Sequence, residues 1–144
     1  MKKVTLVLFV FVALLTGCNV EETAIVCGRE WNPNLEVVAD TANEFEMKDQ
    51  LIVQFRYGKN FDFAKLKTAF YEGTLANKGS EIWNHEVAVS EKMGVYTLQG
   101  KSRHGGLMTA RELCRKKEPG PVVIEVSGDG KVLLSKQILL TKNR

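Results

Sequence analysis

The most suggestive functional segment of this chain is one loop, residues 100–106 (Gly-Lys-Ser-Arg-His-Gly-Gly). Glycines at both ends allow neighbouring backbone amides to converge, and Lys101, Arg103 and His104 add positive charge. Such a loop can hold a phosphate, a carboxylate or an acidic glycan. No strand–loop–helix phosphate fingerprint surrounds it, so the alternative is a solvated loop that leads into the next helix.

Trp83 and His85 form a second candidate surface. They are two residues apart in a segment of alternating polarity, and on a strand this spacing places both side chains on one face. A tryptophan–histidine surface can bind a sugar ring. The alternative is a half-buried histidine whose nitrogens bond the backbone. Trp31, in a turn-like Trp-Asn-Pro-Asn segment, is expected to cap the core.

The sequence favours a protein that is not an enzyme. The chain has two histidines, and a nucleophilic triad would need one of them beside a serine. No Gly-x-Ser-x-Gly elbow occurs, so an envelope hydrolase with His104 as base is the least favoured hypothesis. No Cys-x-x-Cys occurs and no histidine lies near a cysteine, so we expect no metal site and no cofactor.

The first eighteen residues predict export. Lys2 and Lys3 precede an apolar run over residues 4–15, which leads into small residues. A positive region, a short apolar core and a small-residue cleavage site are typical of a secretory signal peptide. A membrane-spanning helix would need about 20 apolar residues, so this run is too short to span. Residues 1–17 are therefore the predicted signal peptide.

The end of this segment, Leu15-Thr16-Gly17-Cys18, resembles the lipobox of bacterial lipoproteins. The resemblance implies cleavage before Cys18 and acylation of Cys18, with residues 18–23 as a lipidated tether. Two or three acyl chains anchor a protein stably, at about 0.8 kcal/mol per buried methylene. Asn19, where an aspartate would favour inner-membrane retention, implies the periplasmic face of the outer membrane. The alternative is ordinary secretory cleavage with an unmodified Cys18.

The composition indicates one domain without nucleic-acid chemistry. Twenty lysines and arginines oppose seventeen acids, and Lys2 and Lys3 account for two of the three net positive charges. The remaining charge is almost balanced, which gives no argument for nucleic-acid binding. Residues 24–144 have the length of a single domain.

Two further cysteines, Cys27 and Cys114, lie in the predicted domain. An exported protein with a pair of cysteines most often joins them in a disulfide. Closing a loop of about 86 residues would stabilise the fold by about 4–5 kcal/mol on the chain-entropy model. The alternative is two separate buried thiols.

A period of two runs through most of the domain and predicts short strands. In residues 51–57, one face carries Leu51, Val53 and Phe55, and the opposite face carries Gln54 and Arg56. Further strands are predicted at residues 35–39, 65–70, 81–89, 95–98, 122–126 and 132–140. The last two are joined by a Ser-Gly-Asp-Gly turn and form a terminal hairpin.

One short helix is predicted near residues 109–117. Thr109 and Glu112 have the spacing of a capping box, and a Pro-Gly-Pro sequence at 119–121 stops the helix. Cys114 lies on this helix, so the predicted disulfide would attach the helix to the N-terminal strand that carries Cys27.

Together these elements predict a mainly β protein, a single β-sandwich of about seven or eight strands with one helix. A partly open β-barrel is the alternative. The helix, Pro-Gly turn and hairpin over residues 107–140 resemble immunoglobulin-like sandwiches. The resemblance implies that Trp83 would be the buried tryptophan between bridged cysteines.

The functional expectation is a lipid-anchored envelope protein that is a non-enzymatic accessory for a protein or cell-wall partner. Such a partner would dock at the 100–106 loop or at a sheet edge. The second hypothesis is a lipoprotein that binds a glycan or small anion through Trp31, Trp83, His85 and Arg103.

Overall fold

The structure, a computed structural model, describes residues 22–144. The predicted signal peptide and Cys18 therefore lie outside the described residues. In the described part of the chain, no helix has the length and apolar character needed to cross a bilayer. Within residues 22–144, nine strands and one helix follow in the order β1 Ala24–Asn32, β2 Val37–Thr41, β3 Glu44–Glu46, β4 Ile52–Arg56, β5 Lys65–Gly73, β6 Lys78–Ala88, β7 Val95–Leu98, α2 Ala110–Cys114, β8 Gly120–Gly128 and β9 Lys131–Thr141.

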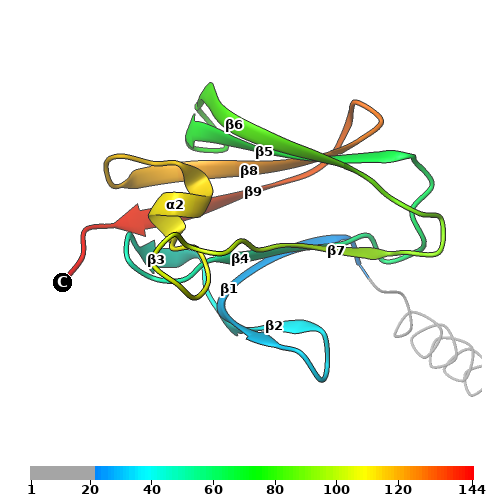
Figure 1. The fold of residues 1–144 in the computed structure, drawn as a ribbon. Helices are drawn as coiled ribbons and strands as arrows, with labels where there is room; N and C mark the ends of the chain where they lie inside the picture. Colours follow the sequence, from blue (N-terminus) through cyan, green and yellow to red (C-terminus); the bar gives the residue numbers. More distant parts are fainter. Residues whose placement is uncertain (1–21) are drawn as a thin grey trace, which may run out of the picture.

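The strands form two sheets that pack face to face (Figure 1). Sheet A has the order β2-β1-β4-β7, and sheet B has the order β3-β9-β8-β5-β6. The predicted mainly β sandwich is confirmed. The strands form two separate sheets and not the partly open barrel of the alternative prediction. Strand β3, which was not predicted, pairs in parallel with β9. It has three residues, which is too short to show an alternating pattern.

The core lies between the sheets, where the alternating faces meet. Leu51, Val53 and Phe55 point inward from β4 and its approach, as the alternation predicts. Four fully buried phenylalanines supply much of the apolar area: Phe45, Phe55, Phe61 and Phe70. Burying side chains of this size stabilises the fold by roughly 1.5–3 kcal/mol each.

The opposite face of β4 is also buried, which the alternation does not predict. Strand β1 pairs with β4 up to Gly28, and from Gly28 onward it pairs with β2 instead. The β1–β2 hairpin thereby turns back over the outer face of sheet A (Figure 1). Gln54 beneath it is 0% exposed, and its Nε2 donates to the Glu36 carbonyl at 3.1 Å. The predicted polar face is therefore an interior one.

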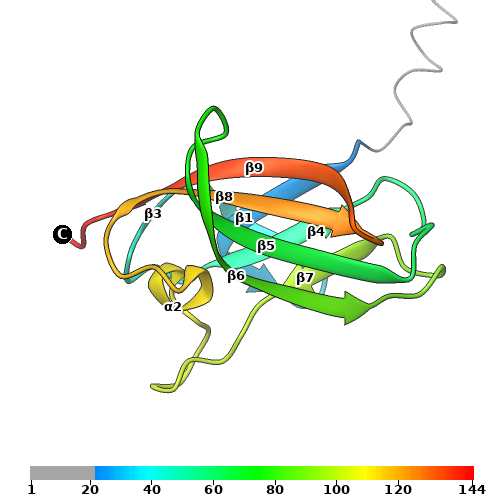
Figure 2. The ribbon, with the colours of Figure 1, turned by 90° about the horizontal axis from the view of Figure 1, so that it is seen from above.

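A second hairpin covers the outer face of sheet B. The β5–β6 hairpin crosses over β8 and β9 (Figure 2), and the backbone amide of Leu75 donates to the Gln137 side chain. Lys78 Nζ lies 2.8 Å from Glu125 Oε2, an ion pair on this face. These contacts explain why Val123 and Glu125 are buried although they point away from the inter-sheet core.

The predicted disulfide is wrong. Cys27 on β1 and Cys114 at the end of α2 are free thiols, 1% and 0% exposed. A disulfide requires two sulfurs about 2.05 Å apart, and the sulfurs of Cys27 and Cys114 do not lie at that distance. Burial raises the pKa of Cys27 to about 12 and also raises that of Cys114. That exported proteins with two cysteines usually pair them is a statistical tendency, which says nothing about where these two side chains lie.

The predicted helix is confirmed but is shorter, Ala110–Cys114. Both halves of the capping box are present: the Thr109 hydroxyl accepts from the Glu112 amide, and the Glu112 carboxylate accepts from the Thr109 amide. Arg115, at φ 50° in the left-handed region, ends the helix before Lys117. In Figures 1 and 2, α2 closes one end of the sandwich.

Candidate functional site

Trp83 holds α2 against sheet B. Its indole Nε1 donates to the Leu113 carbonyl at 2.8 Å, and its ring stacks on Phe70 with centroids 5.3 Å apart. The Arg115 guanidinium lies 4.4 Å from the centroid of the Trp83 ring. Phe70 and Arg115 therefore both pack against the Trp83 ring. The His85 ring lies beside it, with the two ring centroids 6.3 Å apart and the ring planes tilted by 51°. Trp83 and His85 lie side by side, as the strand spacing predicts, and Trp83 packs against α2.

The 100–106 loop satisfies its own backbone groups. The Ser102 amide donates to the Gly106 carbonyl, the Gly105 amide donates to the Ser102 carbonyl, and the His104 amide donates to the Ser102 hydroxyl. Gly105 and Gly106 have φ of 90° and 71°, which only glycine adopts without strain. Because these amides bond within the loop, they do not form the anion cradle that the composition predicts. The side chains of Lys101, Arg103 and His104 remain exposed.

Ser102, His104 and Glu112 lie together but not in a catalytic arrangement. The Ser102 hydroxyl donates directly to Glu112 Oε1 at 2.8 Å. A serine nucleophile needs an imidazole to accept its proton, and within residues 22–144 no hydrogen bond joins the His104 ring to Ser102. The bonds from Thr109 and Ser102 lower the pKa of Glu112 and keep it ionised. This carboxylate caps α2, and the geometry gives His104 no base role.

Two surface hollows flank α2 and are strongly basic. The first has a volume of about 470 Å³ and the second about 500 Å³, and they share Arg111 and Glu112. Glu112 is the single carboxylate that lines them. The six lysines and arginines that line them, named here the basic end, are Lys48, Arg103, Arg111, Arg115, Lys116 and Lys117.

Three members of the basic end are available to a partner. Arg103, Arg111 and Lys117 are exposed and make no ion pair with any of residues 22–144. Lys116, by contrast, is buried and ion-paired with Glu72, and Arg115 is stacked on the Trp83 ring. The surface therefore offers unneutralised positive charge beside two hollows.

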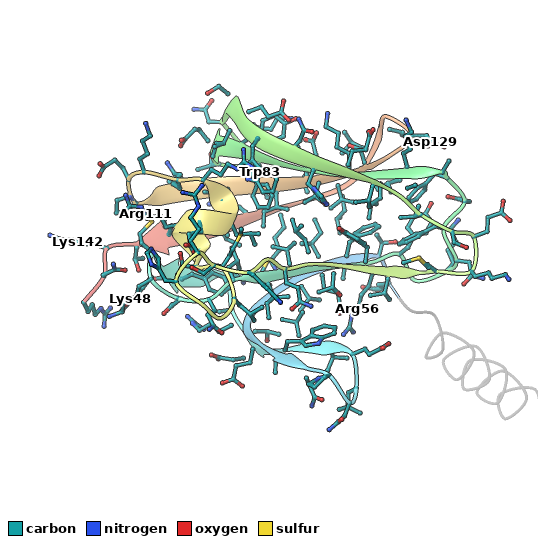
Figure 3. The ribbon with its side chains drawn as sticks, viewed as in Figure 1. Lys48, Arg56, Trp83, Arg111, Asp129 and Lys142 are labelled. Atoms are coloured by element: carbon teal, nitrogen blue, oxygen red, sulfur yellow. The ribbon has the colours of Figure 1, made fainter. Side chains whose placement is uncertain are left out.

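The sequence predicted only part of this surface. Arg103 is the one predicted ligand residue that lines the first hollow, and His104 lines the second. Lys101 lines neither hollow. Lys48 and Arg111 were missed because they are far apart in the sequence, and Figure 3 shows both side chains at the end of the sandwich that carries α2. No local motif could have joined them.

The basic end lies opposite the end at which β1 begins. Strand β4 spans the sandwich, and the Leu51 amide at its start donates to the Met108 carbonyl, next to α2. At its other end, the Tyr57 carbonyl accepts from the Thr23 hydroxyl at 2.8 Å. The first described residues and the basic end are thus separated by the length of β4 (Figure 1).

No protein-family model matches this sequence, and no curated protein matches it. Among solved structures, an immunoglobulin-like protein from Pseudomonas aeruginosa is similar at 13% identity and a TM-score of 0.48, over 85% of this chain and 98% of that one. A β-glucosidase from Erythrobacter marinus is similar at 14% identity and a TM-score of 0.35, over 83% of this chain and 16% of that one. Both likenesses are too weak to carry an argument about function.

Proposed function

We propose that this protein is a lipid-anchored, non-enzymatic binding module of the bacterial envelope, whose basic end binds an acidic protein or cell-wall partner. The observation that carries the proposal is the position of the basic end, opposite the end at which the chain enters the domain from Cys18. A lipid on Cys18 would hold the near end at the membrane, on the periplasmic face of the outer membrane. Arg103, Arg111 and Lys117 would then face away from the membrane.

The chemistry of the basic end supports an anionic partner. Arginine presents a planar fork of donors that pairs with carboxylates and phosphates in two parallel hydrogen bonds. Exposed cations also steer an oppositely charged partner over distances of about a Debye length, roughly 8 Å at physiological salt. Because the Glu112 carboxylate is already bonded to Ser102 and Thr109, it leaves the neighbouring arginines unneutralised.

The alternative is a small anion or an acidic glycan in one of the two hollows. Arg103 and Arg111 line the same hollow, which supports this reading. Such a ligand would be held by side chains, since the amides of Ser102, His104 and Gly105 already donate to oxygens within the loop.

Crosslinking and pull-down of the tagged full-length protein from its native envelope tests the proposal. The test variant carries Arg103→Glu, Arg111→Glu and Lys117→Glu. The matched control carries Lys59→Glu, Lys92→Glu and Lys131→Glu, which changes net charge equally at positions outside the basic end. A Cys18→Ser chain tests the dependence on the anchor.

We expect one stoichiometric partner that is lost with the test variant and with Cys18→Ser but kept with the control. Equal loss in the test and control variants would reject the basic end as the binding surface. Retention of the partner in Cys18→Ser would reject the anchor. If no protein partner is captured, titration with inorganic phosphate and acidic oligosaccharides distinguishes the alternative.

A further inference from the structure

A separate groove lies on the outer face of sheet A, between the β1–β2 hairpin and strands β4 and β7. Its volume is about 490 Å³, which is within the range of pockets that hold small molecules. None of its lining residues lines either hollow beside α2. The groove exists because the hairpin turns back over sheet A, so it depends on the same bend at Gly28 that buries Gln54.

Apolar side chains make up half of the lining of the groove and stand on both of its sides. Trp31, Leu35 and Val37 line it from the hairpin, and Val95 lines it from β7. Leu35 is 70% exposed and Val95 is 43% exposed, so apolar surface faces water on both sides of the groove. Apolar side chains gathered around a concave surface are typical of a ligand site.

One cation, Arg56, lies among these walls, and its orientation is fixed by a buried amide. Gln54 Nε2 donates to the Glu36 carbonyl and to Thr97 Oγ1, which leaves Gln54 Oε1 to accept from Arg56 Nε at 2.8 Å. Since Nε is used, the two terminal nitrogens of Arg56 remain for a ligand.

Arg56 has no acidic partner within residues 22–144. The Glu36 side chain also lines the groove, but it is exposed and makes no ion pair with Arg56. Figure 3 shows Arg56 on the side of sheet A that faces the β1–β2 hairpin. A half-buried arginine that is held in place but unneutralised matches a carboxylate, which accepts two parallel hydrogen bonds from a guanidinium.

We propose that this groove binds a small molecule that has a carboxylate on an apolar body. The carboxylate pairs with the terminal nitrogens of Arg56, and the apolar body packs against Trp31, Leu35 and Val95. Gln54 is a positioning residue, because its side chain is 0% exposed and its Oε1 accepts from the Arg56 guanidinium. The site is independent of the basic end and of the proposed partner.

NMR titration of the full-length protein in a nonionic detergent tests this site, with 4-phenylbutyrate as the probe. The neutral 4-phenylbutyramide has the same apolar body and no charge, so the ratio of the two dissociation constants isolates the contribution of Arg56. We expect shifts of the Trp31 indole and of the β7 backbone. The acid should bind about tenfold more tightly than the amide, a difference of about 1.4 kcal/mol.

Arg56→Gln should abolish the preference for the acid, and Arg56→Lys should restore part of it, because lysine keeps the charge without the fork. Arg103→Gln, a matched loss of one arginine at the basic end, should leave the preference unchanged. Equal binding of acid and amide by the native chain would overturn the proposal. So would a preference that survives Arg56→Gln, or shifts confined to residues outside the groove.

Discussion

The indole Nε1 of Trp83 donates a hydrogen bond to the carbonyl oxygen of Leu113 over 2.8 Å, from an edge strand to the end of α2. The last carbonyls of a helix have no partner within the helix, so this bond satisfies a group that α2 cannot satisfy itself. A helix of five residues is not stable alone and depends on such tertiary contacts. Trp83 therefore links sheet B to the basic end, as does the ion pair between Lys116 and Glu72 on β5.

Trp83→Phe should lower the free energy of unfolding by about 1 kcal/mol. Phenylalanine keeps a ring on Phe70 but loses the donor, and a net hydrogen bond contributes about 0.5–1.5 kcal/mol. Urea unfolding followed by circular dichroism measures the change. Arg115→Ala and Trp83→Leu, alone and combined, form a double-mutant cycle for the stacked cation, because leucine removes the ring. Strict additivity in that cycle would show that Arg115 and Trp83 do not interact.

Gly28→Ala should displace the β1–β2 hairpin. A Cβ atom at this position would lie 2.4 Å from the Ala39 carbonyl oxygen and 2.5 Å from Val38 Cγ1, so the hairpin would have to move. Overpacking of this kind costs about 1–3 kcal/mol. Urea unfolding measures the loss, and the fluorescence of Trp31 on the same hairpin, measured in a Trp83→Phe background that leaves it the single tryptophan of the sequence, reports the displacement.

Gly105→Ala is the comparison for that prediction. Its Cβ would meet no atom within 4 Å, but the backbone is left-handed at φ 90°, so only local strain is added. Trp31 fluorescence should remain native in Gly105→Ala. A native Trp31 signal in Gly28→Ala would contradict the close approach at Gly28.

Cys27 and Cys114 should be unreactive in the native protein. Burial raises the pKa of both thiols, so neither forms appreciable thiolate at neutral pH. In a Cys18→Ser chain, Ellman's reagent should label no thiol in buffer and two thiols after unfolding in guanidinium. Reducing agent should leave the melting temperature unchanged. An intact mass two hydrogens below that of the reduced chain would reveal a disulfide and contradict the structure.

The stability that the ionised Glu112 carboxylate contributes to the capping box should be lost in acid. Hydrogen bonds from Thr109 and Ser102 lower the pKa of Glu112 below its ordinary value of 4.5. A carboxylate with a depressed pKa stabilises the fold above its unfolded pKa, and the stabilisation is lost as the pH falls through the folded pKa. Glu112→Gln should therefore be less stable than the native chain at pH 7, and the difference should shrink below about pH 4.5.

Thermal unfolding at a series of pH values measures this effect. Glu118→Gln is the control, since Glu118 is an exposed acid near the same helix and makes no ion pair within residues 22–144. A difference between the native chain and Glu112→Gln that does not vary with pH would show that Glu112 does not act through its charge.

Local patterns in the sequence determined the strands, the helix start and the last hairpin. Alternation placed Leu51, Val53 and Phe55 in the core, because side chains alternate along any strand. The capping box formed because Thr109 and Glu112 are three residues apart. The hairpin turn formed because Asp129 and Gly130 both adopt positive φ, at 47° and 81°. Each of these features depends on contacts between residues close in the chain.

Tertiary structure alone decided which faces are covered and which distant residues meet. Alternation shows that Gln54 and Arg56 share a face, but only the bend at Gly28 buries Gln54 and creates a groove around Arg56. The number of cysteines cannot give the separation of two sulfurs on elements 87 residues apart, from Cys27 to Cys114. Lys48 and Arg111 meet because the segment before β4 and α2 pack at one end of the sandwich. These outcomes depend on long-range packing, which no short window of sequence contains.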